Sequence, residues 1–233
     1  MKGREMLMNR SELLAVLAEL EENNNRDWYH ANRQRLKAAG DSFEELVGRL
    51  VLKIREFDEE IPLLAPKDLT FKLVRDTRFS HDKSPYNPAF RAHISAKGKL
   101  PVPVGYYIMI KPGNRSFLGG GLFADMFKDA TAMVRDRIAA RGDEWQEILN
   151  APSFAETFTV RGATLKNVPR GYDAAHPQAD YLKYKSWYLE VSLQDSQLTQ
   201  ADFIDTAAET FRKMQPFHRF LNRALAGFQM PER

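Results

Sequence analysis

Apolar positions recur about every 3.6 residues over the first quarter of the chain, and this spacing predicts amphipathic helices. The first helix is predicted to begin at Ser11, and the run Asn23–Asn25 ends it and starts the next one. Gly40 interrupts the pattern again, and a capping box at Ser42 predicts the start of a further helix. We therefore expect N-terminal helices over about residues 11–57.

In the middle of the chain the spacing of apolar residues changes from the helical period to alternation, which is typical of β-strands. Strands are predicted at residues 70–74, 90–96, 106–110, 116–118 and 186–193. Residues 75–88 hold prolines and turn-forming residues and are predicted to be a loop, whereas Lys111–Arg115 has the composition of a hairpin turn. Gly119–Gly121 are predicted to form a turn before a helix that starts near Ala124 or Asp125.

Helical spacing returns after the last predicted strand, over about residues 199–228, and Pro216 is expected to begin a separate final helix. Helices, then strands, then helices is an α+β order, and hairpin-length links make the sheet mainly antiparallel. We expect a single α+β domain over residues 1–233. Its central sheet comes from about residues 69–120 and 186–193, with the N-terminal and C-terminal helices packed on it.

Composition narrows the classes of protein and site. The chain has 233 residues, 43% of them hydrophobic, which is enough to bury a full core. It has no cysteine, so disulfides, thiolate nucleophiles and Cys-ligated zinc are excluded. Charged residues near the N-terminus argue against a signal peptide, and no segment approaches the roughly 20 apolar residues of a membrane span. We expect a cytoplasmic protein with no membrane partner; the sequence does not specify an oligomeric state.

Residues 67–91 form the most densely charged segment of the chain. They include six Lys or Arg and three Asp, a local excess of three positive charges, and the whole chain also has a net charge of +3. The positive and negative charges of the remaining residues therefore cancel. A basic segment in an otherwise neutral chain indicates a place where an anion binds: a ligand, a nucleic-acid phosphate or the protein's own carboxylates.

Three cations of this segment are candidate anion-binding residues, namely Arg75, Arg78 and Lys83. Guanidinium groups bind phosphate or carboxylate oxygens in bidentate fashion, and free amides at the predicted Gly119–Gly121 turn favour the same negative charge. An alternative is that the arginines pair with Asp76 or Asp82 to hold the loop against the sheet. In that case the glycines only permit turns with positive φ.

Acid–base chemistry in this segment stays open, because nothing in the spacing selects one group. Asp76, His81 and Asp82 are the candidate catalytic residues. A metal site would require His93 to converge with those three from a different element, so no metal and no cofactor are expected. Trp28 and Tyr86 are candidate apolar walls of a binding site, although Trp28 on a helix is also typical of a core residue.

Four stretches of the chain carry a family resemblance: NNNRDWYHANRQRL, FKLVRDTRFSHDKSPY, GYYIMIKPGNRSFLGGGLF and the late PRGYDAAHP. Together they resemble the family known as domain of unknown function 2461, from about Leu13 to Leu225. The resemblance implies no activity. It implies that the matching positions belong together: Asn24, Trp28, Arg75, Asp76, Arg78, Phe79, Ser80, Asp82, Lys83, Pro85, Tyr86, Gly119, Gly120 and Gly121. His81 and Asn87 stand where the family commonly has Lys or Arg, which weakens any interpretation based on a large electropositive surface.

Three hypotheses follow. In the first, an anionic small molecule, with or without catalysis, binds a site formed by Asn24, Trp28, Arg75, Arg78, Lys83, Tyr86, Gly119, Gly120 and Gly121. In the second, the same cations contact nucleic-acid phosphates, which the balanced charge elsewhere disfavours without excluding it. In the third, the Arg/Asp string is an internal ion-pair network of a structural or interaction module.

Overall fold

The computed structural model describes residues 2–78, 80–123 and 127–231. Four strands form one antiparallel sheet in the order β1-β2-β3-β4: β1 (Phe90–Ile94), β2 (Tyr106–Ile110), β3 (Ser116–Leu122) and β4 (Trp187–Leu193). Three long helices are α1 (Lys2–Glu22), α3 (Arg33–Arg55) and α10 (Phe203–Ala224). The shorter helices are α2 (Arg26–Ala31), α4 (Pro66–Leu69), α5 (Lys128–Ala140), α6 (Gly142–Asn150), α7 (Pro152–Ala155), α8 (Ala179–Leu182) and α9 (Asp195–Leu198).

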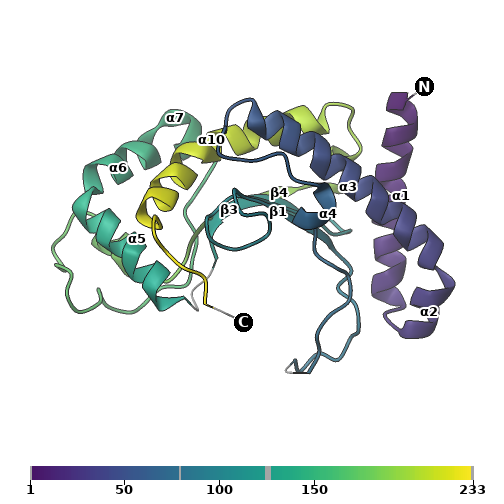
Figure 1. Cartoon of the computed structure of the whole chain (residues 1–233), viewed down its shortest axis with the longest axis horizontal. Helices are drawn as coiled ribbons and strands as arrows, with labels where there is room; N and C mark the ends of the chain where they lie inside the picture. Colours follow the sequence, from purple (N-terminus) through teal and green to yellow (C-terminus); the bar gives the residue numbers. More distant parts are fainter. Residues whose placement is uncertain (1, 79, 124–126, 232–233) are drawn as a thin grey trace.

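The order and pairing of these elements confirm the predicted α+β class with N-terminal and C-terminal helices on an antiparallel sheet. Alternation decides which residues of the sheet are covered. Ala92 and Ile94 of β1 and Leu189 of β4 are buried on the helix side, where Figure 1 shows α3 and α10 lying across the sheet. The register pairs His93 with Tyr107, and both point away from those helices.

Helix α3 is longer than the sequence predicted. The break expected at Gly40 and the capping box expected at Ser42 are both wrong, because α3 runs without interruption from Arg33 to Arg55. The Ser42 hydroxyl donates to Ala38 O within the helix instead of capping a new one. The inner face of α3 stays buried on both sides of this point, so tertiary packing overrides the local breakers.

Helix α10 also passes through a predicted boundary. Pro216 lies inside this helix instead of opening a new one. Phe211 and Met214 before it, and Phe217 and Phe220 after it, are all fully buried. The burial of these four side chains on one continuous apolar face offsets the hydrogen bond that proline cannot donate.

Two predicted strands differ from the structure. Residues 70–74 contribute only isolated bridges, from Thr70 to Ala92 and from Val74 to Tyr86, and no regular strand. By contrast, β3 extends to Leu122 and therefore includes the three glycines predicted as a turn. Ala124 and Asp125, where a helix was expected to start, lie outside the described residues, and the described helix α5 begins at Lys128.

Within the described part of the chain, no helix combines the length and the apolar character needed to cross a membrane.

Candidate functional site

Arg75 is held within the predicted loop by several neighbours. Its guanidinium pairs with Asp82 and also donates to Ser84 O and to Ser80 Oγ, both at 3.3 Å. Hydrogen bonds from Ser84, followed by the Arg75 guanidinium, hold the pKa of Asp82 well below its usual range. The ion pair between Arg75 and Asp82 therefore links the two ends of this loop segment.

The other charged residues of the loop are closer to solvent. Arg78 binds Asp76 through Nη2 and Oδ2 at 2.6 Å, and this contact lowers the pKa of Asp76. Lys83 Nζ donates to Thr77 O at 3.0 Å, and His81 is exposed. The neighbouring Phe79 of the sequence motif lies outside the described residues. The predicted loop cations thus all bind groups of the loop itself, as in the ion-pair hypothesis.

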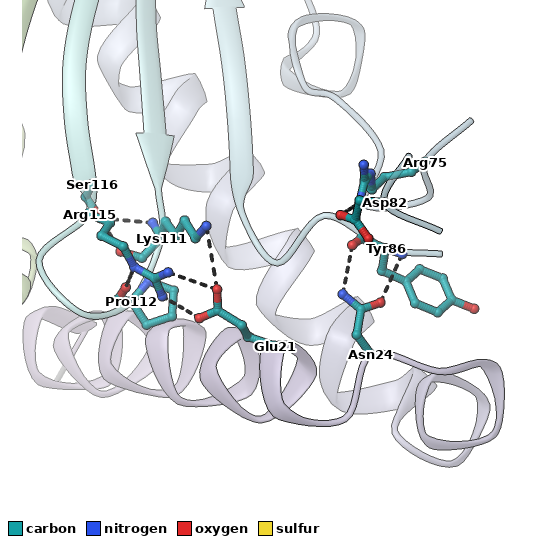
Figure 2. A network of polar contacts seen from close by, with 9 residues as sticks. All are labelled: Glu21, Asn24, Arg75, Asp82, Tyr86, Lys111, Pro112, Arg115 and Ser116. Carbon is teal, nitrogen blue, oxygen red and sulfur yellow. Dashed lines mark hydrogen bonds and ion pairs between the residues drawn. The ribbon is translucent and has the colours of Figure 1, made fainter. Parts of the chain in front are cut away.

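Asn24 ties the end of α1 to this loop. Its side-chain amide donates to Tyr86 O at 2.9 Å and accepts from Tyr86 N at 3.1 Å (Figure 2). The Tyr86 ring is buried and stacks on Tyr29 with ring centroids 4.0 Å apart. Trp28 is half-buried and packs against the core. Asn24 and Tyr86 therefore lie close to Arg75, and the Tyr86 ring takes part in core packing.

A polar cavity of about 370 Å³ lies beside this junction. It is lined by Glu21, Asn24, Arg75, Asp82, Ser84, Tyr86, Asn87, Pro88 and Lys111. Glu21 pairs with Lys111 at 3.6 Å and also with Arg115, and Arg115 is the main cause of the lowered pKa of Glu21. Figure 2 shows these residues along α1, the hairpin turn and the loop. Glu21 and Lys111 are not among the predicted site residues, because only folding brings these segments together.

Gly119–Gly121 do not form the predicted anion-binding turn. They pair with β4 along their whole length, and Gly119 and Gly120 also pair with β2, so their amides lie within the sheet. The absence of a side chain at Gly120 leaves room for the buried ring of His218 from α10. Gly121 lines a different cavity from the one that contains Arg75. The glycines therefore serve close packing, and the structure does not bring them to the loop cations.

That second cavity, here called the aromatic hollow, has a volume of about 360 Å³ on the sheet face away from α3 and α10. It is lined by Phe71, His93, Lys99, Pro101, Tyr107, Phe117, Gly121 and Phe123. Tyr107 stacks on Phe117 with centroids 5.6 Å apart. Burial lowers the pKa of His93 to about 4, so its imidazole is neutral at pH 7. His93 lines this hollow, whereas Asp76, His81 and Asp82 do not. Among the residues described, no group of three metal-ligating side chains converges.

A third cavity of about 470 Å³, here called the cationic hollow, lies between α3 and residues 67–74. Its charged lining residues are Arg33, Lys37, Glu44, Lys67, Lys72 and Lys99. Lys37 pairs with Asp41 at 2.6 Å, and Lys99 Nζ donates to Thr70 O at 3.3 Å. Lys67 and Lys72 belong to the basic segment recognised in the sequence, and Arg33 belongs to the first of the four family stretches. Lys99 comes from a segment that no motif singled out.

Comparisons with known proteins complete the description of the chain. Searches of curated proteins and of solved structures found no match. The model of a family described as conserved hypothetical protein (DUF2461) matches residues 12–220, which cover the loop motif, the hairpin and the three glycines. This match confirms the resemblance carried by those stretches, and the chain therefore belongs to the conserved hypothetical protein family DUF2461.

Proposed function

We propose that this protein binds an anionic small molecule, carrying phosphate or carboxylate groups, in the cationic hollow. The supporting observation is the charge of the lining: five cations surround one carboxylate, an excess of four positive charges. A concave surface with charge of one sign focuses the electrostatic field and raises the local concentration of an oppositely charged ligand. A volume of about 470 Å³ lies within the usual range for small-molecule sites.

The ion pairing of the individual cations favours this cavity over the loop as the anion site. Within the described chain, Arg33, Lys67 and Lys72 form no ion pair with a carboxylate. An incoming anion therefore has no protein carboxylate to displace from them. At the loop, by contrast, it competes with Asp82 for Arg75. Charge-assisted hydrogen bonds to phosphate or carboxylate are among the stronger polar contacts, so the free cations carry most of the expected affinity.

Three separate segments present these cations to one space. Arg33 and Lys37 stand one turn apart on α3 and project from the same side of that helix. Lys67 lies on α4, Lys72 follows it outside any helix or strand, and Lys99 comes from the turn after β1. A ligand with several anionic oxygens can therefore contact cations from more than one side.

The test is calorimetric titration with inorganic triphosphate and with citrate at constant ionic strength. We expect Arg33→Gln and Lys72→Gln each to weaken binding about tenfold, the loss of one charge-assisted hydrogen bond. Lys183→Gln is the matched control, since Lys183 pairs with Asp180 on the remote α8 and should bind as the wild type does. Equal affinity of the wild type and the Arg33→Gln/Lys72→Gln double variant would rule out this site.

A second candidate for the same function is the polar cavity at the loop, which includes Asn24, Arg75 and Tyr86 of the site predicted from the sequence. It is favoured by one observation: Glu21 is shared by Lys111 and Arg115, so this group has one more cation than carboxylates. Here Arg75 and Lys111 would hold the anion next to Asn24 and Tyr86. Arg78 and Lys83 belong to the same loop but do not line this cavity. Asp76, His81 and Asp82 would be the groups available for proton transfer.

The two candidates give opposite results in one experiment. If the polar cavity is the site, Arg75→Ala and Lys111→Ala should abolish triphosphate binding while Arg33→Gln has no effect. If the loop is instead only an ion-pair network, Arg75→Ala should lower the melting temperature without changing affinity for either anion. Melting curves recorded on the same samples separate these results.

A further inference from the structure

The cationic hollow and the aromatic hollow are neighbours. Phe71 and Lys99 line both cavities, so one aromatic ring and one ammonium group form the boundary between them. Lys99 is exposed, and its ammonium group donates a hydrogen bond to Thr70 O. A molecule bound in one cavity therefore lies within reach of the lining of the other.

The aromatic hollow has the lining expected for a planar ligand. Tyr107 is surrounded by rings, with Phe117 at 5.6 Å, Phe123 at 6.0 Å and Phe71 at 6.4 Å between centroids. Phe123 also stacks on Tyr188 at 4.5 Å, yet 41% of Phe123 stays exposed. An exposed ring within an ordered aromatic cluster offers a face on which a planar molecule can stack.

The backbone of this region supports that arrangement. Gly121 lines the hollow without a side chain, so the backbone of β3 forms this part of the wall. The His93 ring is buried, and the backbone of Lys99 and Leu100 acts on its pKa in the direction opposite to burial. Because His93 is neutral at pH 7, the positive charges of the combined site gather at its Phe71 and Lys99 end.

We propose that the ligand combines a planar aromatic part, stacked in the aromatic hollow, with phosphate groups held in the cationic hollow. This is the chemistry of a nucleotide. The inference rests on the proposed function, because it requires the cationic hollow to bind the phosphates. The same chemistry is found in a free mononucleotide and in a single-stranded oligonucleotide, and the experiment below distinguishes these sources.

The experiment compares four probes on the full chain: adenosine triphosphate, inorganic triphosphate, adenosine and a six-nucleotide single strand. We expect adenosine triphosphate to bind at least tenfold more tightly than either of its parts, because stacking and charge contacts act on one molecule. Phe123→Leu removes the exposed ring and keeps an apolar side chain. This substitution should weaken the binding of adenosine triphosphate about tenfold and leave the affinity for inorganic triphosphate unchanged.

Two controls make the outcome unambiguous. Leu63→Ala alters another exposed apolar residue, 69% accessible, and should change neither affinity. Melting curves verify that Phe123→Leu is folded. If inorganic triphosphate binds as tightly as adenosine triphosphate, this inference is wrong while the proposed function stands. If neither binds, the proposed function fails as well. A single strand that binds more tightly than the mononucleotide, with affinity that falls steeply as salt rises, identifies nucleic acid as the source.

Discussion

At the scale of single residues, His218 is the most unusual group in the core. Its side chain is 2% exposed, and neither ring nitrogen has a hydrogen-bond partner among the described residues. Its ring lies against Gly120, and the centroid of Tyr106 is 4.7 Å from its own. Burial lowers the pKa of His218 to about 3, so it packs as a neutral ring. The missing side chain at Gly120 makes this packing geometrically feasible.

Gly120→Ala should therefore destabilise the protein. The added Cβ would overlap the buried His218 ring and approach Gly105 O at 2.7 Å, closer than real Cβ contacts. We expect the free energy of unfolding to fall by about 1–3 kcal/mol, the usual cost of overpacking. Gly40→Ala within α3 is the control, since an added Cβ would lie 3.8 Å from its nearest neighbour, Phe90 Cε1, and this variant should be neutral or gain up to about 1 kcal/mol. If urea unfolding gives the same free energy of unfolding for Gly120→Ala and Gly40→Ala, the packing of His218 against Gly120 is contradicted.

At the scale of elements, the C-terminal end of α1 connects two segments that are distant in sequence. Glu21 pairs with Arg115 of the hairpin turn, and Asn24 binds the backbone of Tyr86 in the loop (Figure 2). The Asn24 amide satisfies both backbone groups of Tyr86, as a neighbouring strand would. The last turn of α1 and the residues just after it thus position both walls of the polar cavity.

Asn24→Ala should loosen the loop more than a comparable change next to it. Loss of the two hydrogen bonds leaves Tyr86 N and O without partners, at an expected cost of about 1–3 kcal/mol in the free energy of unfolding. Asn23→Ala removes only a bond to Glu19 O within the same turn and should cost less. Hydrogen exchange over residues 75–88 should become faster in Asn24→Ala alone. Equal exchange in both variants would show that Asn24 does not anchor the loop.

At the scale of the whole molecule, two buried histidines couple stability to pH. Burial lowers the pKa of His93 to about 4 and that of His218 to about 3, from an ordinary value of 6.5. Below pH 6.5 the unfolded chain therefore binds protons that the folded protein does not, so stability falls as pH falls. Glu21 and Asp82, whose pKa values are lowered in the folded protein, also stabilise it. Their contribution is lost only at more acidic pH, as the pH falls below their ordinary pKa values of 4.5 and 3.8.

Between pH 7 and pH 5 we expect a loss of about 2 kcal/mol for each of the two histidines. Urea unfolding at the two pH values measures this loss. His93→Gln, which cannot be protonated, should show a smaller decrease than the wild type, while His30→Gln, at an exposed position on α2, should follow the wild-type curve. A wild-type stability that does not change between pH 7 and pH 5 would exclude buried neutral histidines.

Much of the fold is encoded locally. Alternating residues in β1 and β4 predict both the strands and their buried faces, and the Lys111–Arg115 turn predicts the hairpin between β2 and β3. Asn25 caps α2 by accepting from Trp28 N, as expected from the asparagine run. These features follow from side-chain periodicity and turn chemistry, which act over a few residues and so are readable from a single sequence.

The sequence by itself thus determined the α+β class, strands β1, β2 and β4, the hairpin, the family, and a basic segment at residues 67–91. Only the tertiary structure decided that α3 and α10 continue through Gly40 and Pro216, because buried side chains on both sides outweigh local breakers. It also placed the glycines inside β3 and separated Lys72 from Arg75, bringing Lys72 to Arg33 and Lys99. Such groupings depend on contacts between distant segments, and no local pattern records them.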